Sequence, residues 1–151
     1  MINKDLNILH DFNILYLEDD ENLLKHTSDV LEDFVNNIFA VKTSTEAMDV
    51  LLNKKVDVII SDILLKDENG IDFLKHVKSK NINLPAILTT AHTDTNYLLD
   101  AIKLKVDNYI VKPINIKELL DSLHDVLLPL VQEKKKKKNK NVIKTISVIT
   151  D

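Results

Sequence analysis

Val56-Asp57-Val58-Ile59-Ile60-Ser61-Asp62 is the stretch that decides the fold of this chain of 151 residues. Its β-branched residues do not alternate regularly with polar ones, which predicts a strand that is buried on both faces of a sheet. Asp62 stands where that strand leaves the sheet. A carboxylate in this place is either a turn residue that ends the strand or a functional group, and the other strands must decide between the two.

Apolar segments of strand length alternate with segments of helical spacing along the whole chain. The predicted strands cover residues 13–17, 38–41, 56–62, 85–90 and 108–111. The predicted helices cover residues 23–35, 43–52, 71–80, 94–105 and 115–128. Such alternation is typical of an α/β protein whose strands run parallel and whose helices cover both faces of the sheet.

Local signals refine the predicted helices. Thr43 with Glu46, and Asn115 with Glu118, have the spacing of residues that cap a helix start. The helix over 94–105 should carry Leu98, Ala101 and Ile102 on one face. The last helix carries an apolar stripe for the core, and Pro129 should kink it or end it near Leu128. The stripe comprises Leu119, Leu123, Val126, Leu127 and Leu130.

Composition and charge restrict the class of protein. The chain has no Cys, no apolar run close to the ~20 residues of a membrane span, and no signal peptide, so we expect a cytoplasmic location without a membrane partner. Residues 134–151 hold seven Lys and one Asp, or +6, which leaves −10 on residues 1–133 from the total of −4. This acidity argues against nucleic-acid binding, and a single Gly excludes Gly-rich phosphate loops.

The same patterns divide the chain. We expect residues 1–11 to form a lead-in or short helix and residues 12–131 to form the domain. Residues 132–151 are a Lys-rich tail, either a solvated helix end or a linker to an output domain that this chain does not contain. The run of five consecutive Lys residues also raises the hypothesis of contact with a nucleic acid or a membrane, but a solvated linker is the favoured interpretation.

Polar side chains follow four of the five predicted strands. Glu18 and Asp19 follow the first strand, Asp62 ends the third, Thr90 ends the fourth, and Lys112 follows the fifth. The carboxyl ends of parallel strands meet at one edge of the sheet, where ligands bind. Three carboxylates at this edge would repel one another unless a divalent cation such as Mg²⁺ lay between them. A cation, an ammonium and a hydroxyl around a carboxylate are the groups that phosphoryl transfer onto that carboxylate requires.

Four segments carry a specific resemblance. They are Ile14-Leu15-Tyr16-Leu17-Glu18-Asp19-Asp20, Ile60-Ser61-Asp62 with Gly70 eight residues later, Leu88-Thr89-Thr90-Ala91, and Tyr109-Ile110-Val111-Lys112-Pro113. In this order and spacing, over roughly residues 12–130, they make the sequence resemble the receiver domain of bacterial two-component response regulators. The resemblance implies a flavodoxin-like, doubly wound sheet of five parallel strands in the order 2-1-3-4-5.

The resemblance also implies a phosphorylation site. Asp62 would accept a phosphoryl group from the phosphohistidine of a histidine kinase or phosphotransfer protein. Asp19 and Asp62 would bind Mg²⁺ directly, Glu18 would bind it through a water, and the backbone carbonyl of Leu64 would supply another ligand. Lys112 would pair with the phosphoryl oxygens.

Two further roles follow from the resemblance. Thr90 would turn inward to hydrogen-bond the phosphoryl group, and Tyr109 would follow it from an exposed rotamer, so that the pair forms the switch. The peptide bond between Lys112 and Pro113 would be cis. The domain would then be a signalling receiver that catalyses only its own phosphoryl transfer and dephosphorylation.

The sequence departs from the family pattern at several positions. Lys66 stands where the family usually has Pro, and Lys105 stands near a usual Gly, so an altered backbone is expected after the fourth helix. Leu64 and His92 lie two residues beyond Asp62 and Thr90, where the family tunes dephosphorylation. Because an apolar Leu64 cannot orient an attacking water, we expect slow self-dephosphorylation.

Two other functions remain open from the residues alone. The first is a degenerate receiver that acts as an interaction module without phosphorylation. The second is a flavodoxin-like phosphatase with an aspartyl intermediate, although the segment after Asp62 lacks the second Asp of that motif.

The chain also has two candidate surfaces for a homodimer. One is the face made by the fourth helix, the fifth strand and the last helix. The other is a second stripe on the last helix, which is either a dimer seam or a covered surface between domains and is formed by Leu120, His124, Leu128 and Val131.

Overall fold

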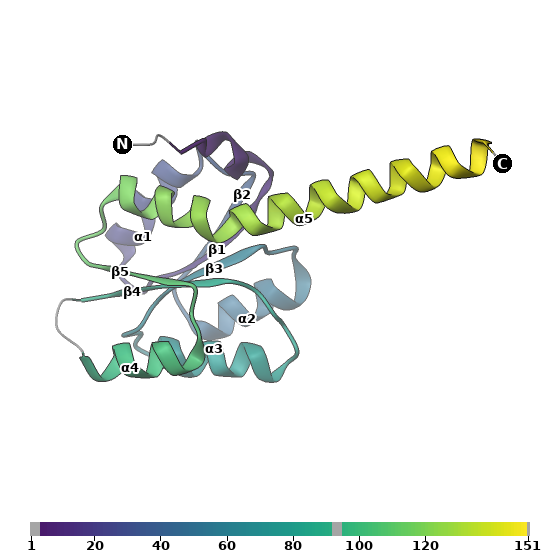
Figure 1. Cartoon of the computed structure of the whole chain (residues 1–151). Coiled ribbons are helices and arrows are strands. Elements are labelled where there is room, and N and C mark those ends of the chain that lie inside the picture. Colours follow the sequence, from purple (N-terminus) through teal and green to yellow (C-terminus); the bar gives the residue numbers. More distant parts are fainter. Residues whose placement is uncertain (1–3, 92–94, 151) are drawn as a thin grey trace.

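The computed structural model describes residues 4–91 and 95–150, with side chains apart from those of residues 95, 96, 98 and 142–150 (Figure 1). The strands are β1 (Asn13–Leu17), β2 (Asn37–Val41), β3 (Val58–Asp62), β4 (Ala86–Thr90) and β5 (Asn108–Val111). The helices are η1 (Leu6–Asp11), α1 (Glu21–Leu31), α2 (Ser44–Asn53), α3 (Gly70–Ser79), α4 (Thr95–Leu104) and α5 (Ile116–Thr150).

The strands form one parallel sheet in the order β2-β1-β3-β4-β5, which confirms the predicted flavodoxin-like topology. Helices α1 and α5 cover one face, and α2, α3 and α4 cover the other (Figure 1). The first crossover runs from β1 to β2 on one side and the next returns to β3 on the other side of β1. This reversal leaves a crevice at the carboxyl ends of β1 and β3, where ligands bind in such sheets.

Two apolar clusters hold the layers together, one on each face of the sheet. Along β3, Val58 and Ile60 face α1 and α5, whereas Ile59 faces α2, α3 and α4. All three side chains are buried, as the absence of alternation in this segment predicted. The strand begins at Val58 rather than at Val56, and Asp57 before it accepts a hydrogen bond from the Asn13 backbone N–H at 2.8 Å.

Side-chain caps begin the helices that lead away from the carboxyl edge. The Asp20 carboxylate accepts from the Leu23 N–H at the start of α1, and Asn69 accepts from the Ile71 N–H at the start of α3. The two predicted caps are confirmed as well, since Thr43 and Asn115 each accept a hydrogen bond from a backbone N–H three residues later. Each cap satisfies one of the otherwise unpaired amides of a helix start.

Two predictions about the helices are wrong. Helix α1 ends at Leu31, not near Val35, because the N–H groups of Asp33 and Phe34 bond three residues back and tighten the chain into a turn. Ile102 does not share the buried face of Ala101, since its side chain is 64% exposed. The buried side of α4 carries Ala101, with Leu104 packed beside it, and Ile102 points away.

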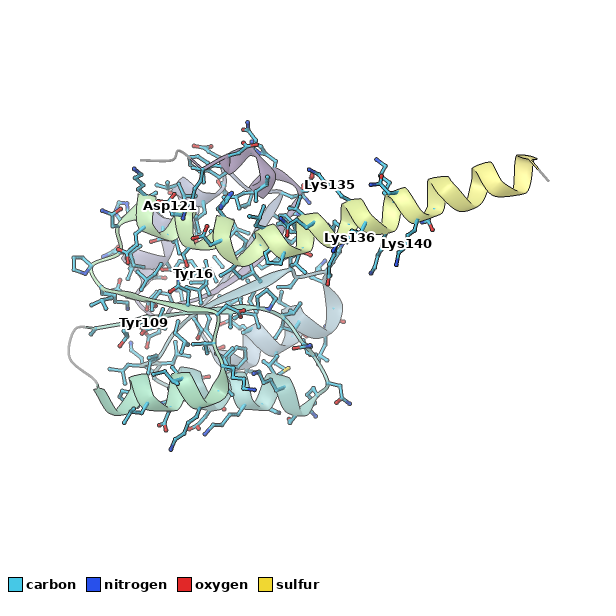
Figure 2. All side chains as sticks on the ribbon, in the orientation of Figure 1. Tyr16, Tyr109, Asp121, Lys135, Lys136 and Lys140 are labelled. Carbon is cyan, nitrogen blue, oxygen red and sulfur yellow. The ribbon has the colours of Figure 1, made fainter. Side chains whose placement is uncertain are left out.

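Pro129 does not end the last helix. Helix α5 continues through it to Thr150 and extends well beyond the sheet (Figure 1). Pro129 and Asp125 are both exposed, so the carbonyl that loses its intrahelical donor lies on the water side, where solvent can satisfy it. The Lys residues from 134 to 140 are helical and exposed, and Figure 2 shows Lys135, Lys136 and Lys140 projecting from this extension.

The second stripe of α5 is largely covered by the same chain. Leu120 is only 5% exposed and belongs to one cluster with Leu9 and Phe12, which lie in and just after η1. Leu6 and Val131 pack against this cluster. The lead-in is therefore a short helix that holds the start of the chain against α5. Within the described part of the chain, no helix is both long enough and apolar enough to cross a membrane.

Two helices end on residues with a left-handed backbone. Lys105 follows α4 with φ 60°, and Asn81 follows α3 with φ 60°. The N–H groups of Lys105 and Val106 return to the carbonyls of Ile102 and Ala101, which is a Schellman ending. The altered backbone predicted at Lys105 is thus confirmed. A lysine there carries a steric cost that Gly would avoid and that Asn tolerates better.

We predict that Lys105→Gly raises the free energy of unfolding by about 1 kcal/mol, because it removes the clash of a Cβ atom in the left-handed region. Asn81→Gly is the matched control and should change stability by only a few tenths of a kcal/mol. Urea unfolding followed by circular dichroism measures both. Equal effects of the two variants would contradict the assignment of strain to Lys105.

Candidate functional site

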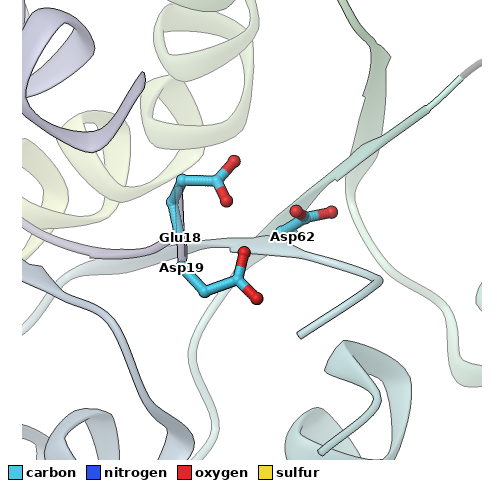
Figure 3. A group of neighbouring side chains, drawn as sticks. All are labelled: Glu18, Asp19 and Asp62. Carbon is cyan, nitrogen blue, oxygen red and sulfur yellow. The ribbon is translucent and has the colours of Figure 1, made fainter. Parts of the chain in front are cut away.

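Three carboxylates meet at the carboxyl edge of the sheet. Glu18 and Asp19 directly follow β1, and Asp62 is the last residue of β3. Each offers an oxygen that lies within 4.8 Å of the others (Figure 3). Glu18 and Asp62 are buried and Asp19 is half-buried. The pairing of Leu17 with Ser61 places the ends of these two strands level with each other.

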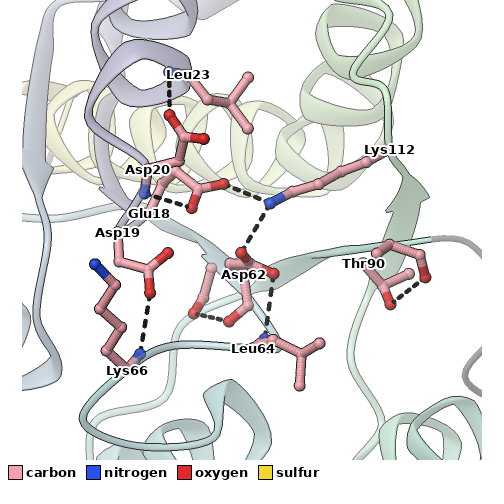
Figure 4. A network of polar contacts seen from close by, with 11 residues as sticks. Glu18, Asp19, Asp20, Leu23, Asp62, Leu64, Lys66, Thr90 and Lys112 are labelled. Atoms are coloured by element: carbon pink, nitrogen blue, oxygen red, sulfur yellow. Dashed lines mark hydrogen bonds and ion pairs between the residues drawn. The ribbon is translucent and has the colours of Figure 1, made fainter.

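Lys112 brings a positive charge to two of these acids. Its Nζ atom lies 2.6 Å from Glu18 Oε1 and 2.8 Å from Asp62 Oδ2 (Figure 4). Lys112 directly follows β5, and its backbone N–H donates to the Thr90 carbonyl at 2.7 Å, which ties it to the end of β4. The Lys112–Pro113 peptide bond is cis, as expected from the sequence.

Burial and pairing shift the acidity of these groups in a definite direction. Burial raises the pKa of Glu18, and its hydrogen bonds from Lys112 and from the Asp20 N–H only partly offset that effect. Burial would lower the pKa of Lys112, but hydrogen bonds to Asp62 and Glu18 outweigh it and the pKa is raised. Lys112 therefore remains an ammonium at neutral pH.

A backbone amide also donates to one oxygen of each carboxylate. The Leu64 N–H donates to Asp62 Oδ1 at 3.2 Å, and the Asp20 N–H donates to Glu18 Oε2 at 3.1 Å. The Lys66 N–H donates to Asp19 Oδ2 at 3.0 Å (Figure 4). The segment that connects β3 to α3 thus bonds to acids from two different strands.

Gly70 makes the close approach of that segment possible. A Cβ atom on Gly70 would lie 2.1 Å from the Asp62 carbonyl oxygen, which no side chain could tolerate. The Gly70 N–H donates to the Ile63 carbonyl at 2.7 Å, so α3 begins directly against the end of β3. The spacing of eight residues between Asp62 and the single Gly of the chain therefore has a steric cause.

Thr90 is the last residue of β4 and Tyr109 lies two residues before the end of β5, and both are outside the polar cluster. The Thr90 hydroxyl donates to the Ala91 carbonyl at 3.1 Å and makes no hydrogen bond to Asp62 or Lys112. Tyr109 is 42% exposed, whereas Tyr16 is buried between the sheet and α5 (Figure 2). His92 lies outside the described residues.

The donor set fits a small, hard divalent cation. Glu18, Asp19 and Asp62 supply oxygen atoms, and Lys112 supplies the only ammonium that pairs with them among the described residues. Three carboxylates against one ammonium leave a net negative charge, which a cation such as Mg²⁺ would neutralise.

Two contacts of the site were not foreseen from the sequence. One is the Lys66 amide on Asp19, and the other is Asp67, whose Oδ2 atom accepts from the N–H and the hydroxyl of Ser44 at 3.0 and 2.8 Å. The first involves a backbone group, which has no signature in the sequence. The second joins segments that become neighbours only after folding.

Comparison with known proteins identifies the family. The chain belongs to the response regulator receiver domain family, whose sequence model matches residues 14–124. It is 27% identical over 108 residues to the DNA-binding transcriptional regulator NtrC of Proteus hauseri, which covers 72% of this chain and 23% of that protein. It is 28% identical over 130 residues to the two-component response regulator ARR10 of Arabidopsis thaliana, and this match covers 85% of this chain and 23% of ARR10.

The fold agrees with solved receiver structures. A CheY-like receiver domain protein from Methanospirillum hungatei superposes with a TM-score of 0.75 at 24% identity, over 82% of this chain and 98% of that one. The chain is thus a signalling domain of the two-component type. It spans about a quarter of the length of the NtrC and ARR10 relatives that it matches.

Proposed function

We propose that this chain is a phosphoacceptor receiver in which Asp62 takes a phosphoryl group from the phosphohistidine of a histidine kinase or phosphotransfer protein, with Mg²⁺ as cofactor. The observation that carries the proposal is the Asp62 carboxylate, which ends a buried strand between Lys112 and two further acids. One oxygen of the Asp62 carboxylate attacks phosphorus, the bond from phosphorus to the histidine nitrogen breaks, and the imidazole leaves with the electron pair.

The residues around Asp62 have separate tasks in this transfer. Lys112 neutralises charge on the phosphoryl oxygens and is already held 2.8 Å from the acceptor carboxylate. Asp19 and Asp62 would hold the cation directly, Glu18 through a water, and the Leu64 carbonyl would complete the ligand set. When bound, Mg²⁺ would neutralise the carboxylates and the phosphoryl oxygens.

The proposed switch uses Thr90 and Tyr109. The Thr90 hydroxyl bonds to its neighbour's carbonyl, and Tyr109 is partly exposed, as expected of a state without a phosphoryl group. A phosphoryl group on Asp62 offers strong acceptor oxygens, to which the Thr90 hydroxyl turns and donates. Tyr109 then moves toward the vacated space, and the equilibrium between two arrangements of the β4–α4 region shifts.

The chief alternative is a degenerate receiver that acts as an interaction module without phosphorylation. The complete set of three acids, Thr90 and Lys112 argues against it, because such a module has no need of a buried, charged cluster. The phosphorylation experiment below separates the two functions.

Incubation with a small phosphodonor and Mg²⁺ should add one phosphoryl group to the protein. Asp62→Asn should abolish the gain in mass, because an amide oxygen is not a nucleophile of comparable strength. Asp72→Asn is the matched control, since Asp72 is an exposed carboxylate on α3 that lies outside the acidic cluster. Intact-protein mass spectrometry measures all three proteins. A wild-type chain that gains no mass would refute the proposal.

We predict that the phosphorylated chain hydrolyses slowly and that Leu64→Asn shortens its half-life several-fold. The Leu64 side chain is 47% exposed next to Asp62 and has no group that could orient an attacking water, whereas Asn has one. Leu64→Ala controls for the loss of apolar bulk alone. A half-life of seconds in the wild type that Leu64→Asn leaves unchanged would contradict this prediction.

The domain limits and the partners complete the proposal. Residues 12–131 form the cytoplasmic receiver, residues 1–11 form a lead-in, and residues 132–151 form a Lys-rich tail or a linker to an output domain. For a homodimer, the face of α4, β5 and α5 is favoured, because η1 covers much of the second stripe of α5. The α4–β5 face exposes four large apolar side chains, namely Leu99, Ile102, Tyr109 and Val111.

Phosphorylation should therefore convert a monomer into a dimer, and Ile102→Glu should prevent this by placing a charge in the apolar face. Leu52→Glu on α2 is the control. Leu52 is also highly exposed, at 65%, but α2 follows β2, which is the outer strand at the opposite end of the sheet from β5. Light scattering before and after phosphorylation measures the mass. A monomer under both conditions would exclude the homodimer.

A further inference from the structure

The segment from Ile63 to Gly70 crosses the acidic cluster in a compact loop. It leaves β3 at Asp62, forms an isolated antiparallel bridge between Leu64 and Asn69, and closes with the hydrogen bond from the Gly70 N–H to the Ile63 carbonyl. These contacts fix the two ends of the loop next to each other. The middle of the loop, at Lys66, lies beside Asp19 (Figure 4).

Asp19 depends on this loop for its orientation. Glu18 and Asp62 each accept a hydrogen bond from Lys112 and another from a backbone amide. For Asp19, the Lys66 N–H at 3.0 Å is the only hydrogen-bond donor to the carboxylate among the described residues. Figure 4 shows one Asp19 oxygen on this amide and the other turned toward Asp62.

The residue that follows Lys66 fixes the position of the Lys66 amide. Asp67, the next residue, accepts from the N–H and the hydroxyl of Ser44 at the start of α2. Helix α2 packs on the sheet through the buried side chain of Ala47. The donor that Lys66 presents to Asp19 is therefore anchored to the body of the domain rather than to a free loop.

We propose that the backbone N–H of Lys66 positions Asp19 for the cation, by holding one carboxylate oxygen so that the other faces Asp62 and Glu18. This inference rests on the proposed function. It also gives Lys66 a role that a proline could not fill, because proline has no N–H to donate. The positioning is carried by the backbone, so the ammonium of Lys66 is not required.

The expected consequence is a gain in affinity for Mg²⁺. A ligand that is already oriented loses less conformational freedom when the cation binds. Without the N–H, the Asp19 side chain can rotate away between binding events. The dissociation constant for Mg²⁺ should then rise several-fold, on the order of three- to tenfold for the loss of one hydrogen bond of typical net strength.

Two variants isolate the N–H group. Lys66→Pro removes the ammonium and the N–H, whereas Lys66→Ala removes only the ammonium. Isothermal titration calorimetry of the full chain with MgCl₂ should give a dissociation constant three to ten times higher for Lys66→Pro than for Lys66→Ala. Equal constants, or tighter binding by Lys66→Pro, would overturn the proposal.

A measurement on the intact loop covers the case in which Lys66→Pro does not fold. In the NMR spectrum, the Lys66 amide proton should move to lower frequency in Asp19→Asn, because a neutral amide accepts a weaker hydrogen bond than a carboxylate. The Lys78 amide, inside α3, is the internal control and should not move. An unchanged Lys66 resonance would also overturn the proposal.

The two proposals fail in different ways. If Lys66→Pro and Lys66→Ala bind Mg²⁺ equally and the wild type is still phosphorylated on Asp62, only the positioning by Lys66 is wrong. If the wild type binds no Mg²⁺ and gains no phosphoryl group, the proposed function is wrong and the inference falls with it.

Discussion

The ammonium of Lys112, which bridges Glu18 and Asp62, is the interaction on which the site depends. Two buried carboxylates this close together would be unstable without a counter-charge, and the acidic cluster includes Asp19 as well. Lys112 can reach both acids because β5 ends beside β4 and its backbone N–H bonds to Thr90. The pairing of β5 with β4 thus places the ammonium of Lys112 where it compensates the buried carboxylates at the ends of β1 and β3.

A steric constraint at Gly70 completes the site. Because α3 begins against the carbonyl of Asp62, the connecting loop must fold tightly over the acids. In this tight loop the N–H groups of Leu64 and Lys66 point into the cluster, where they donate hydrogen bonds to Asp62 and Asp19. The same feature that limits the loop sterically therefore provides the hydrogen bonds that the carboxylates need.

The last helix shows where reasoning from local sequence fails. Pro129 predicts a kink or a helix end near Leu128, yet α5 continues through it because the lost hydrogen bond lies on the exposed side. The second stripe on α5 suggests a surface for a partner, yet Leu9 and Phe12 from the start of the chain pack against Leu120. Neither outcome is visible in a window of neighbouring residues, since each depends on which side of the helix meets water or another segment.

The sequence by itself determined the fold class, the strand order through the family resemblance, and the set of polar residues at the strand ends. Unbroken apolar runs that are followed by a carboxylate, a hydroxyl or an ammonium are typical of a parallel sheet whose ligand site lies at the carboxyl ends of the strands. Only the tertiary structure decided how these groups pair, that Lys112 bonds to Glu18 as well as to Asp62, and that the Lys66 amide bonds to Asp19. Such contacts involve backbone groups and residues far apart in the chain, and their geometry exists only once the sheet and the β3–α3 loop are in place.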